Sequence, residues 1–413
     1  MNIMKIELSK TLRSVILLHA LIFICGSVSG ATIDEIRGLW DIGSLKKTPS
    51  FRDAALKEDG VKGIFIEGLP CKGRKTEFFA WYGIPKNASG KVPGIILLHG
   101  SGLTANVEWV RIWNDKGYAA IAIDYDGCIP VANVSGSGGW TYHKWGGPCH
   151  AAQFDQANLD LKNQWFYHAV ANAIQAHSFL LSRPEVDPEQ TGLTGISWGA
   201  QLALIVSGLD GRYKFTVPVY ASGFLDESSH WTETIKKLGP EKAARWAYWQ
   251  DPRHYIPLIK NPVLLINGTN DPFYFDSTVK SFNLLNCPKQ LCLKVRLPHS
   301  HPAAYQQKEV YAFADSIVKN ETKLPQILKQ NFSNGVFSCE YASVLPVQQI
   351  TYNFTKDSGD WKKRKWETLT VSSDGAQGNK FFKEIDGAVS AFFFNITDNG
   401  GLTASSIPVI KNQ

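Results

Sequence analysis

The stretch TGLTGISWGAQLALIVSGLDG, residues 191–211, decides how the rest of the chain is interpreted. TGLTGI has the short apolar pattern of a buried strand, and WGAQLALIVSGL has the length and composition of a helix. Between them lies Ser197, flanked by Gly195 and Gly199, and a sharp strand-to-helix turn needs such small neighbours. Such a turn exposes the serine beside a helix N-terminus, which favours negative charge. Because G-x-S-x-G is a weak pattern on its own, the rest of the chain must supply a base and an acid.

An acid and a base follow the serine in the chain, each just after an apolar run. LLINGTNDPF places Asp271 beyond an expected strand at 261–268, and VRLPHSHPAAY places two histidines beyond an expected strand at 292–298. A serine hydroxyl is a weak nucleophile that needs a base, and the base needs a carboxylate to orient it. Serine, acid and histidine in this order, each at the carboxyl end of a strand, predict a nucleophilic triad.

For two positions of this triad, the sequence offers a second candidate residue. We predict His301 as the base and not His299, because a strand that runs to Pro298 leaves His299 too close to the strand end to curve back over the serine. We predict Asp271 as the acid, and the alternative is Asp226, just after an earlier strand. Taken singly, each of these residues also fits an ordinary turn or an exposed loop.

An oxyanion site is predicted after the first parallel strand. The motif LLHGSG ends that strand with small residues, which let backbone N–H groups approach the reaction centre. We predict the N–H of Trp198 as one donor and that of Ser101 as the other, with Gly102 as the alternative to Ser101. Losing one such donor typically costs about 3 kcal/mol of barrier. His99 is predicted to hold the loop rather than to transfer protons.

The spacing of apolar runs predicts the fold class. Two alternating segments, 61–70 and 76–85, predict an antiparallel hairpin. Short apolar runs separated by helical patterns then predict an α/β fold, with a mostly parallel sheet and helices on both faces. The expected parallel strands lie at 92–100, 117–125, 191–197, 213–221, 261–268 and 292–298, and the expected helices at 105–116, 165–182, 198–209, 276–286 and 303–319.

The chain divides into a leader, a large α/β domain and a small β-domain in this interpretation. Residues 32–323 form the catalytic domain, and its two long insertions, at about 126–164 and 222–258, are predicted to be functional loops. After residue 323 only short strand patterns occur, so residues 324–413 predict a β-sandwich-like accessory module.

Residues 1–31 have the pattern of a secretory signal peptide. Lys5, Lys10 and Arg13 precede the apolar stretch SVILLHALIFICG, which ends in the small residues SVSGA. The apolar stretch is short for a membrane span, and no later segment reaches the roughly 18 apolar residues that a span needs. We therefore expect a secreted or periplasmic product without stable membrane insertion.

The charge distribution and the spacing of the cysteines limit which binding partners and ligands we expect. The net charge of +6 falls to +4 without the three basic residues and one acidic residue of the leader. There is no long basic run, and KKRK at 362–365 fits an exposed turn, so nucleic acid is not an expected partner. No C-x-x-C pair occurs, and neither a metal nor a cofactor is predicted. Oligomeric state is not predicted.

Six cysteines remain after the leader, and an even number in an exported chain favours disulfides. Our preferred pairs are Cys128–Cys149 and Cys287–Cys292, and buried free thiols are the alternative.

The motifs HGSG, GISWGA, LLINGTND and PHSHP resemble the dienelactone-hydrolase, acetylxylan-esterase and prolyl-oligopeptidase group of α/β-hydrolases over roughly residues 60–322. The resemblance implies the α/β-hydrolase fold and a serine triad, and it says little about the substrate. One departure is Ala200, where many relatives have a second glycine. The C-terminal module resembles small Ig-like or fibronectin-type domains of secreted hydrolases.

The expected function is a secreted serine hydrolase, first of all an esterase that removes acyl groups from a carbohydrate. Trp140, Trp145 and Trp231 in the aromatic-rich insertions are candidate platforms for sugar rings, although such residues also form an insertion's own small core. A serine peptidase or amidase of the prolyl-oligopeptidase type is the alternative. A non-catalytic sugar-binding or adhesion protein is disfavoured because all three triad residues are present.

Overall fold

The structure is a computed structural model that describes residues 33–131, 139–150, 153–371 and 379–411. The expected signal peptide lies outside the described residues. The chain divides into two compact units, Met1–Leu39 and Trp40–Gln413. The first contributes helix α2 (Ile33–Gly38) to the described part, and the features below belong to the second. Among the described residues, no helix combines the length and the apolar character needed to cross a membrane.

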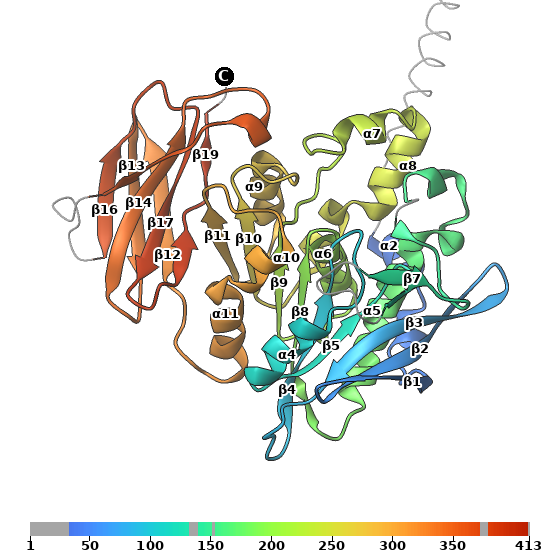
Figure 1. Cartoon of the computed structure of the whole chain (residues 1–413). Helices are drawn as coiled ribbons and strands as arrows, with labels where there is room; N and C mark the ends of the chain where they lie inside the picture. The colour runs from blue at the N-terminus through green and yellow to red at the C-terminus, as the bar shows by residue number, and fades with distance from the viewer. Residues whose placement is uncertain (1–32, 132–138, 151–152, 372–378, 412–413) are drawn as a thin grey trace, which may run out of the picture. The chain divides into compact units, whose positions relative to one another are not determined.

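A nine-stranded sheet forms the centre of the described second unit, in the order β1-β2-β3-β5-β4-β8-β9-β10-β11 (Figure 1). Strands β1, β2, β3 and β5 pair antiparallel, and every pairing from β5 to β11 is parallel. The predicted hairpin and the predicted mostly parallel sheet are therefore confirmed. The strands are β1 (Phe51–Glu58), β2 (Val61–Cys71), β3 (Arg74–Gly83), β4 (Val92–Leu98), β5 (Ala119–Ile123), β8 (Val186–Ile196), β9 (Phe215–Val219), β10 (Val263–Gly268) and β11 (Lys289–Lys294).

Helices cover both faces of the sheet, which is why its central strands are apolar throughout. In β10, Leu264 packs in the same cluster as Phe313, whereas the next residue, Leu265, packs in a second cluster with Val279. Successive side chains of a strand point to opposite faces, so the two clusters lie on the two sides of the sheet. The helices are α3 (Ile42–Leu45), α4 (Val107–Asp115), α5 (Trp165–Leu181), α6 (Trp198–Leu209), α7 (Thr232–Lys236), α8 (Pro240–Gln250), α9 (Phe275–Leu284), α10 (His301–Tyr305) and α11 (Lys308–Val318).

The two insertions carry short elements of their own. A small antiparallel ribbon and single turns of 3-10 helix follow β5, and helices α7 and α8 follow β9. The short elements are β6 (Cys128–Pro130), β7 (Trp140–Tyr142), η2 (Asp155–Asn158), η3 (Leu161–Asn163), η4 (Pro252–His254) and η5 (Ile256–Leu258).

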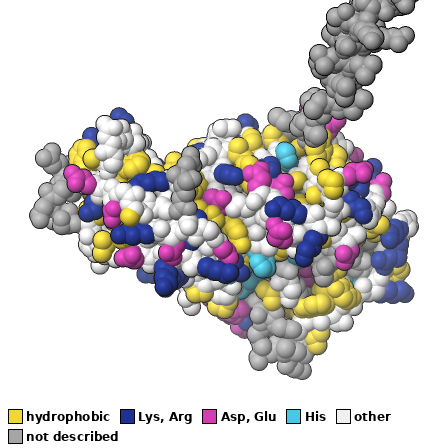
Figure 2. Space-filling model, turned by 90° about the horizontal axis from the view of Figure 1, so that it is seen from above, with side chains coloured by type: hydrophobic (Ala, Val, Ile, Leu, Met, Phe, Trp, Pro, Cys, Tyr) yellow, Lys and Arg dark blue, Asp and Glu magenta, His cyan; other side chains and the backbone are white. Residues whose placement is uncertain are grey.

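In the view from above, acidic and basic side chains are interspersed over the visible surface and are not separated by sign (Figure 2).

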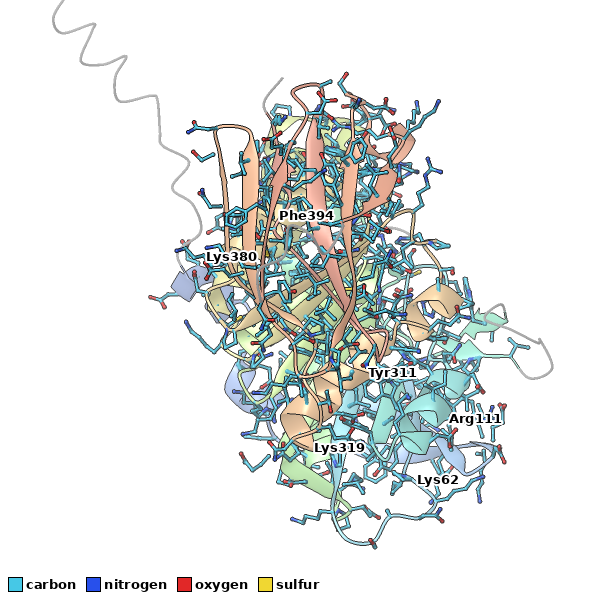
Figure 3. All side chains as sticks on the ribbon, turned by 90° about the vertical axis from the view of Figure 1, so that its left-hand side faces the viewer. Lys62, Arg111, Tyr311, Lys319, Lys380 and Phe394 are labelled. Atoms are coloured by element: carbon cyan, nitrogen blue, oxygen red, sulfur yellow. The ribbon has the colours of Figure 1, made fainter. Side chains whose placement is uncertain are left out.

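The C-terminal residues form two antiparallel sheets, one of β12-β13-β16 and one built on β15-β14-β17-β18 with β19 beside β17. A phenylalanine-rich cluster fills the space between them, and Phe394 of β17 belongs to it (Figure 3). Its ring stacks on that of Phe337 with centroids 4.6 Å apart. The elements are β12 (Gln326–Ser333), β13 (Val336–Ala342), β14 (Val347–Thr355), η6 (Trp361–Lys363), β15 (Glu367–Thr370), β16 (Lys380–Glu384), β17 (Ala391–Asp398), β18 (Thr403–Ser405) and β19 (Val409–Ile410).

The C-terminal sheets lie directly against the edge strand β11 of the central sheet. Leu293 donates its N–H to Ser405 Oγ at 2.7 Å and accepts a hydrogen bond from Asn395 Nδ2 at 3.0 Å. Phe393 shares a cluster with Phe275 of α9, whose ring centroid lies 5.8 Å away. An unpaired edge strand invites aggregation, and here the C-terminal sheets cover it. The described residues after 323 thus share a buried interface with the part that holds the central sheet, and the boundary at 323/324 stays a prediction.

The two preferred disulfides are not formed in the described part of the chain. Cys292 lies inside β11, and Cys287 lies in a bend before the strand begins at Lys289. Near the other pair, Tyr142 donates its hydroxyl to Cys149 Sγ at 2.9 Å, and Cys128 Sγ lies 3.6 Å from the Asp126 carbonyl oxygen.

Candidate active site

Ser197 lies on a strained turn between β8 and α6. Its φ of 59° and ψ of −123° are unusual for a residue with a side chain, and its N–H is held by the Val219 carbonyl at 2.9 Å. A Cβ atom on Gly195 would lie 2.2 Å from the Gly199 carbonyl oxygen, and one on Gly199 would lie 2.1 Å from the Leu98 carbonyl oxygen. Both glycines are therefore required by close backbone packing, as the G-x-S-x-G pattern predicts for a sharp turn.

Ser197, His299 and Asp271 form a continuous hydrogen-bonded triad. Ser197 Oγ lies 2.9 Å from His299 Nε2, and His299 Nδ1 lies 2.6 Å from Asp271 Oδ2. The second carboxylate oxygen of Asp271 accepts the Phe273 N–H at 2.8 Å. Burial raises the pKa of Asp271, and the hydrogen bond from His299 opposes that shift. The carboxylate therefore favours the tautomer in which Nδ1 carries the proton and Nε2 is free to accept the serine proton.

The prediction that His301 lies against Ser197 is wrong, and His299 occupies that position. The prediction assumed a strand that runs to Pro298, but β11 ends at Lys294, where its last pairing partner in β10 is Gly268. Four residues, 295–298, therefore separate the strand from His299, and they let the chain curve back over the serine.

His301 instead holds the backbone of the loop after β4. The N–H of Gly100 donates to His301 Nε2 at 2.8 Å, and His301 Nδ1 lies 2.8 Å from the Tyr305 hydroxyl. Burial lowers the pKa of His301 to about 3, and the neighbouring His99 and His299 act in the same direction. Since Nε2 accepts an amide proton and the ring stays neutral, Nδ1–H donates to Tyr305.

The alternative acid, Asp226, belongs to a separate ion-pair cluster. Arg253 donates to Asp226 and also binds Glu227 at 2.8 Å, while Asp251 lies 3.1 Å from its Nε. Asp271, not Asp226, is the carboxylate hydrogen-bonded to the histidine that contacts Ser197.

One predicted oxyanion donor, Trp198, directly follows the serine, and the other, Ser101, lies in the loop after β4. A Cβ atom on Gly100 would lie 3.4 Å from Ser197 Cβ, so the loop after β4 passes beside Ser197. The Gly100 N–H is taken by His301. The described residues provide no hydrogen-bond acceptor for the N–H groups of Trp198 and Ser101. These two groups are therefore available to an oxygen atom of a ligand, which keeps Trp198 and Ser101 as the candidate donors.

A buried polar network behind this loop was missed by the sequence analysis. His150 Nδ1 lies 3.0 Å from Ser101 Oγ, and the His150 N–H donates to Asp126 Oδ1 at 3.0 Å. Burial lowers the pKa of His150 to about 3 and raises that of Asp126 to about 7. The neighbouring Asp124 accepts the N–H of Cys128 and the hydroxyl of Thr104. The only sequence signal was the DYDG motif after a buried strand, which is also ordinary turn chemistry.

The three candidate substrate-binding tryptophans lie in different surroundings. Trp140 donates Nε1–H to the Gly102 carbonyl at 3.2 Å, directly beside the proposed oxyanion loop. Trp231 packs with centroids 5.1 Å from Trp198 and 4.7 Å from Phe273, so it belongs to the aromatic wall next to the triad. Trp145 is 38% exposed and lines a separate groove.

Residues 64–317 match the family model described as acetyl xylan esterase (AXE1). Acetyl esterase Axe7A of Xylanibacter ruminicola is 24% identical over 234 residues, which cover 52% of this chain and 51% of that protein. The chain thus spans about half the length of this curated relative.

A solved structure shows the same fold. The acetyl xylan esterase from Paenibacillus sp. R4 superposes with a TM-score of 0.57 at 22% identity, covering 73% of this chain and 99% of that one. The likeness shows an α/β-hydrolase fold, as the resemblance implied. The family match, which spans more than half of the chain, goes further: the protein belongs to the acetyl xylan esterase (AXE1) family.

Proposed function

We propose that this protein is a serine esterase that removes acetyl groups from an acylated carbohydrate. The observation that carries the proposal is the Ser197–His299–Asp271 relay, with 2.9 and 2.6 Å between successive partners, in a chain of the acetyl xylan esterase family. The family's description, acetyl xylan esterase, supports an acetylated sugar as the substrate, and the curated relative named acetyl esterase supports the acetyl group.

The proposed mechanism starts with attack by Ser197 Oγ on the ester carbonyl carbon. His299 Nε2 takes the hydroxyl proton, and Asp271 stabilises the imidazolium that forms. The carbonyl oxygen becomes an oxyanion, which accepts hydrogen bonds from the N–H groups of Trp198 and Ser101. His299 then gives its proton to the departing sugar oxygen, which leaves an acetyl group on Ser197. Water, activated by His299, releases acetate and restores the serine.

His301 has a positioning role in this proposal. By accepting the Gly100 N–H, it fixes the His99–Gly100 peptide unit, which directly precedes the unit that carries the Ser101 N–H. A buried neutral imidazole suits this role, because a protonated Nε2 would face the amide hydrogen and break the bond.

Export is a further part of the proposal. The basic start, short apolar stretch and small residues of segment 1–31 support cleavage of a leader. N-terminal sequencing of protein recovered from the medium or the periplasm tests it: a mature chain that begins near residue 32 is expected, and an intact N-terminus contradicts export by this leader.

Covalent labelling tests the nucleophile. A fluorophosphonate probe should label the wild-type protein at Ser197, located by peptide mass spectrometry, and should not label Ser197→Ala. His299→Ala should label at least about 10³-fold more slowly, because the serine has lost its base. Ser207→Ala is the matched control, since that serine lies buried in α6 and bonds Asn261. Labelling at another serine would contradict the proposed mechanism.

A further inference from the structure

A groove beside strands β1–β3 combines exposed aromatic rings with balanced charges. It has a volume of about 380 Å³, within the range of small-molecule sites, and none of the triad residues lines it. Phe51 and Trp145, which are 46% and 38% exposed, both line the groove. Large exposed aromatic rings that line one groove are unusual for a surface without a binding partner.

The backbone around Trp145 is held at the groove by residues of strand β3. Its carbonyl accepts the Glu77 N–H of β3 at 2.8 Å. Arg74, also on β3, donates to the carbonyls of Lys144 at 2.5 Å and Gly146 at 2.9 Å. The peptide units on both sides of the indole are therefore fixed. Because this backbone is already ordered, binding a ligand has to order only the side-chain torsions of Trp145.

The charged side chains that line the groove sum to no net charge, and two of them, Arg52 and Glu77, are paired. The Arg52 guanidinium lies 4.2 Å from the ring centre of Phe65 and binds both carboxylate oxygens of Glu77, at 3.1 and 2.6 Å. Lys75 and Glu67 add one further charge of each sign to the lining. A site built to hold an ionic ligand would carry an excess of one sign.

We propose that this groove binds a neutral polysaccharide chain and so forms a substrate subsite remote from the scissile ester. Sugar rings present apolar C–H faces, which match the exposed indole and phenyl rings, and a rim of hydroxyls, which match donors and acceptors of both signs. This inference rests on the proposed carbohydrate substrate. The segment 139–150 links the groove to the active site, because Trp140, on the same segment as Trp145, contacts the Gly102 carbonyl.

Affinity electrophoresis in gels that contain unacetylated neutral xylan, mannan or β-glucan tests the groove. The protein used is full-length Ser197→Ala, so that binding is measured without turnover. At least one polysaccharide should retard this protein. Trp145→Ala or Phe51→Ala, added to it, should weaken the apparent affinity by about tenfold. Phe382→Ala is the matched control, because its ring is 50% exposed in β16, far along the chain, and its loss should leave retardation unchanged.

Two results would overturn the groove proposal: no retardation of Ser197→Ala by any of the three polysaccharides, or equal retardation of the parent protein and both groove variants. Melting temperatures of the variants, expected within a few degrees of the parent, show that each is folded. Failure of the proposed esterase function gives a different result, the absence of acetate release by the wild-type protein, and this binding assay does not depend on it.

Discussion

His301 Nε2 accepts the backbone N–H of Gly100 at 2.8 Å, so the second histidine of PHSHP holds the loop beside Ser197. The first histidine of the same motif, His299, contacts Ser197. Two histidines separated by one residue thus serve two sides of one site, and their roles are separable by substitution.

The positioning role of His301 predicts a selective loss of turnover. His301→Phe keeps a planar ring but removes the acceptor, and kcat should fall by about 10²-fold with KM changed little, the scale of losing one oxyanion donor. His301→Gln offers a carbonyl oxygen to the Gly100 N–H and should recover much of that loss. Steady-state kinetics on an aryl acetate measure both. A His301→Phe variant with wild-type kcat, or a glutamine variant no better than phenylalanine, would contradict this role.

The low pKa of His301 predicts how stability depends on pH. With a folded-state pKa of about 3, against an ordinary value of 6.5, His301 binds fewer protons in the folded than in the unfolded state between these values. Its contribution to stability is therefore complete above pH 6.5 and is lost as the pH falls, by up to about 1.4 kcal/mol per pH unit.

His301→Gln does not titrate, so its melting temperature should drop less between pH 7 and pH 4.5 than that of the wild type. Burial raises the pKa values of the buried neighbours Asp124 and Asp126, and these two groups act in the opposite direction. Both proteins contain them, so the comparison isolates His301. Equal melting-temperature drops in the two proteins would count against a buried neutral imidazole.

The close packing of the nucleophile turn predicts intolerance of a methyl group at Gly199. Its Cβ would lie 2.1 Å from the Leu98 carbonyl oxygen and 2.3 Å from that of His99, so backbone must move. Gly199→Ala should cost about 3 kcal/mol of unfolding free energy and most of the activity. At Gly211 a Cβ meets nothing within 4 Å, and Gly211→Ala should change stability by less than about 0.5 kcal/mol. Similar denaturation midpoints for the two variants would refute the packing argument.

A contact between the acid loop and the connection from β14 to β15 predicts that the C-terminal part and the acid loop are coupled. Asn270, next to Asp271, donates Nδ2–H to the carbonyls of Trp361, Lys362 and Arg364, at 3.2, 3.0 and 2.8 Å. Asn270→Ala should lower the unfolding free energy by about 1–2 kcal/mol, because these acceptors lose their donor. It should also lower kcat, because the loop that carries the triad carboxylate is released.

Asn331→Ala, at an exposed position of β12, is the control for this prediction and should behave as wild type in thermal melts and kinetics. If Asn270→Ala matches this control in both measurements, the contact has no role in holding the acid loop.

Sequence patterns predicted the sheet and the serine turn because strand–helix alternation and the two glycines are local requirements. The patterns assigned the wrong histidine to Ser197 because the apolar run VRL, residues 295–297, continues beyond the point where β11 ends. The length of β11 is set by its neighbour: β10 stops at Gly268, opposite Lys294, and Arg296 then turns with a φ of 52°. The contact between KKRK and the acid loop also could not be predicted from the sequence, because it depends on how distant segments pack.

Acetate release from acetylated xylan tests the central claim most directly. Wild-type protein should release acetate, and Ser197→Ala and His299→Ala should each be slower by about 10⁴-fold or more, while His301→Gln stays within about tenfold of wild type. Peptide amides, the substrates of the alternative peptidase function, should be cleaved slowly or not at all. Efficient cleavage of peptide amides without release of acetate, or full activity of the His299→Ala variant, would contradict the proposed function.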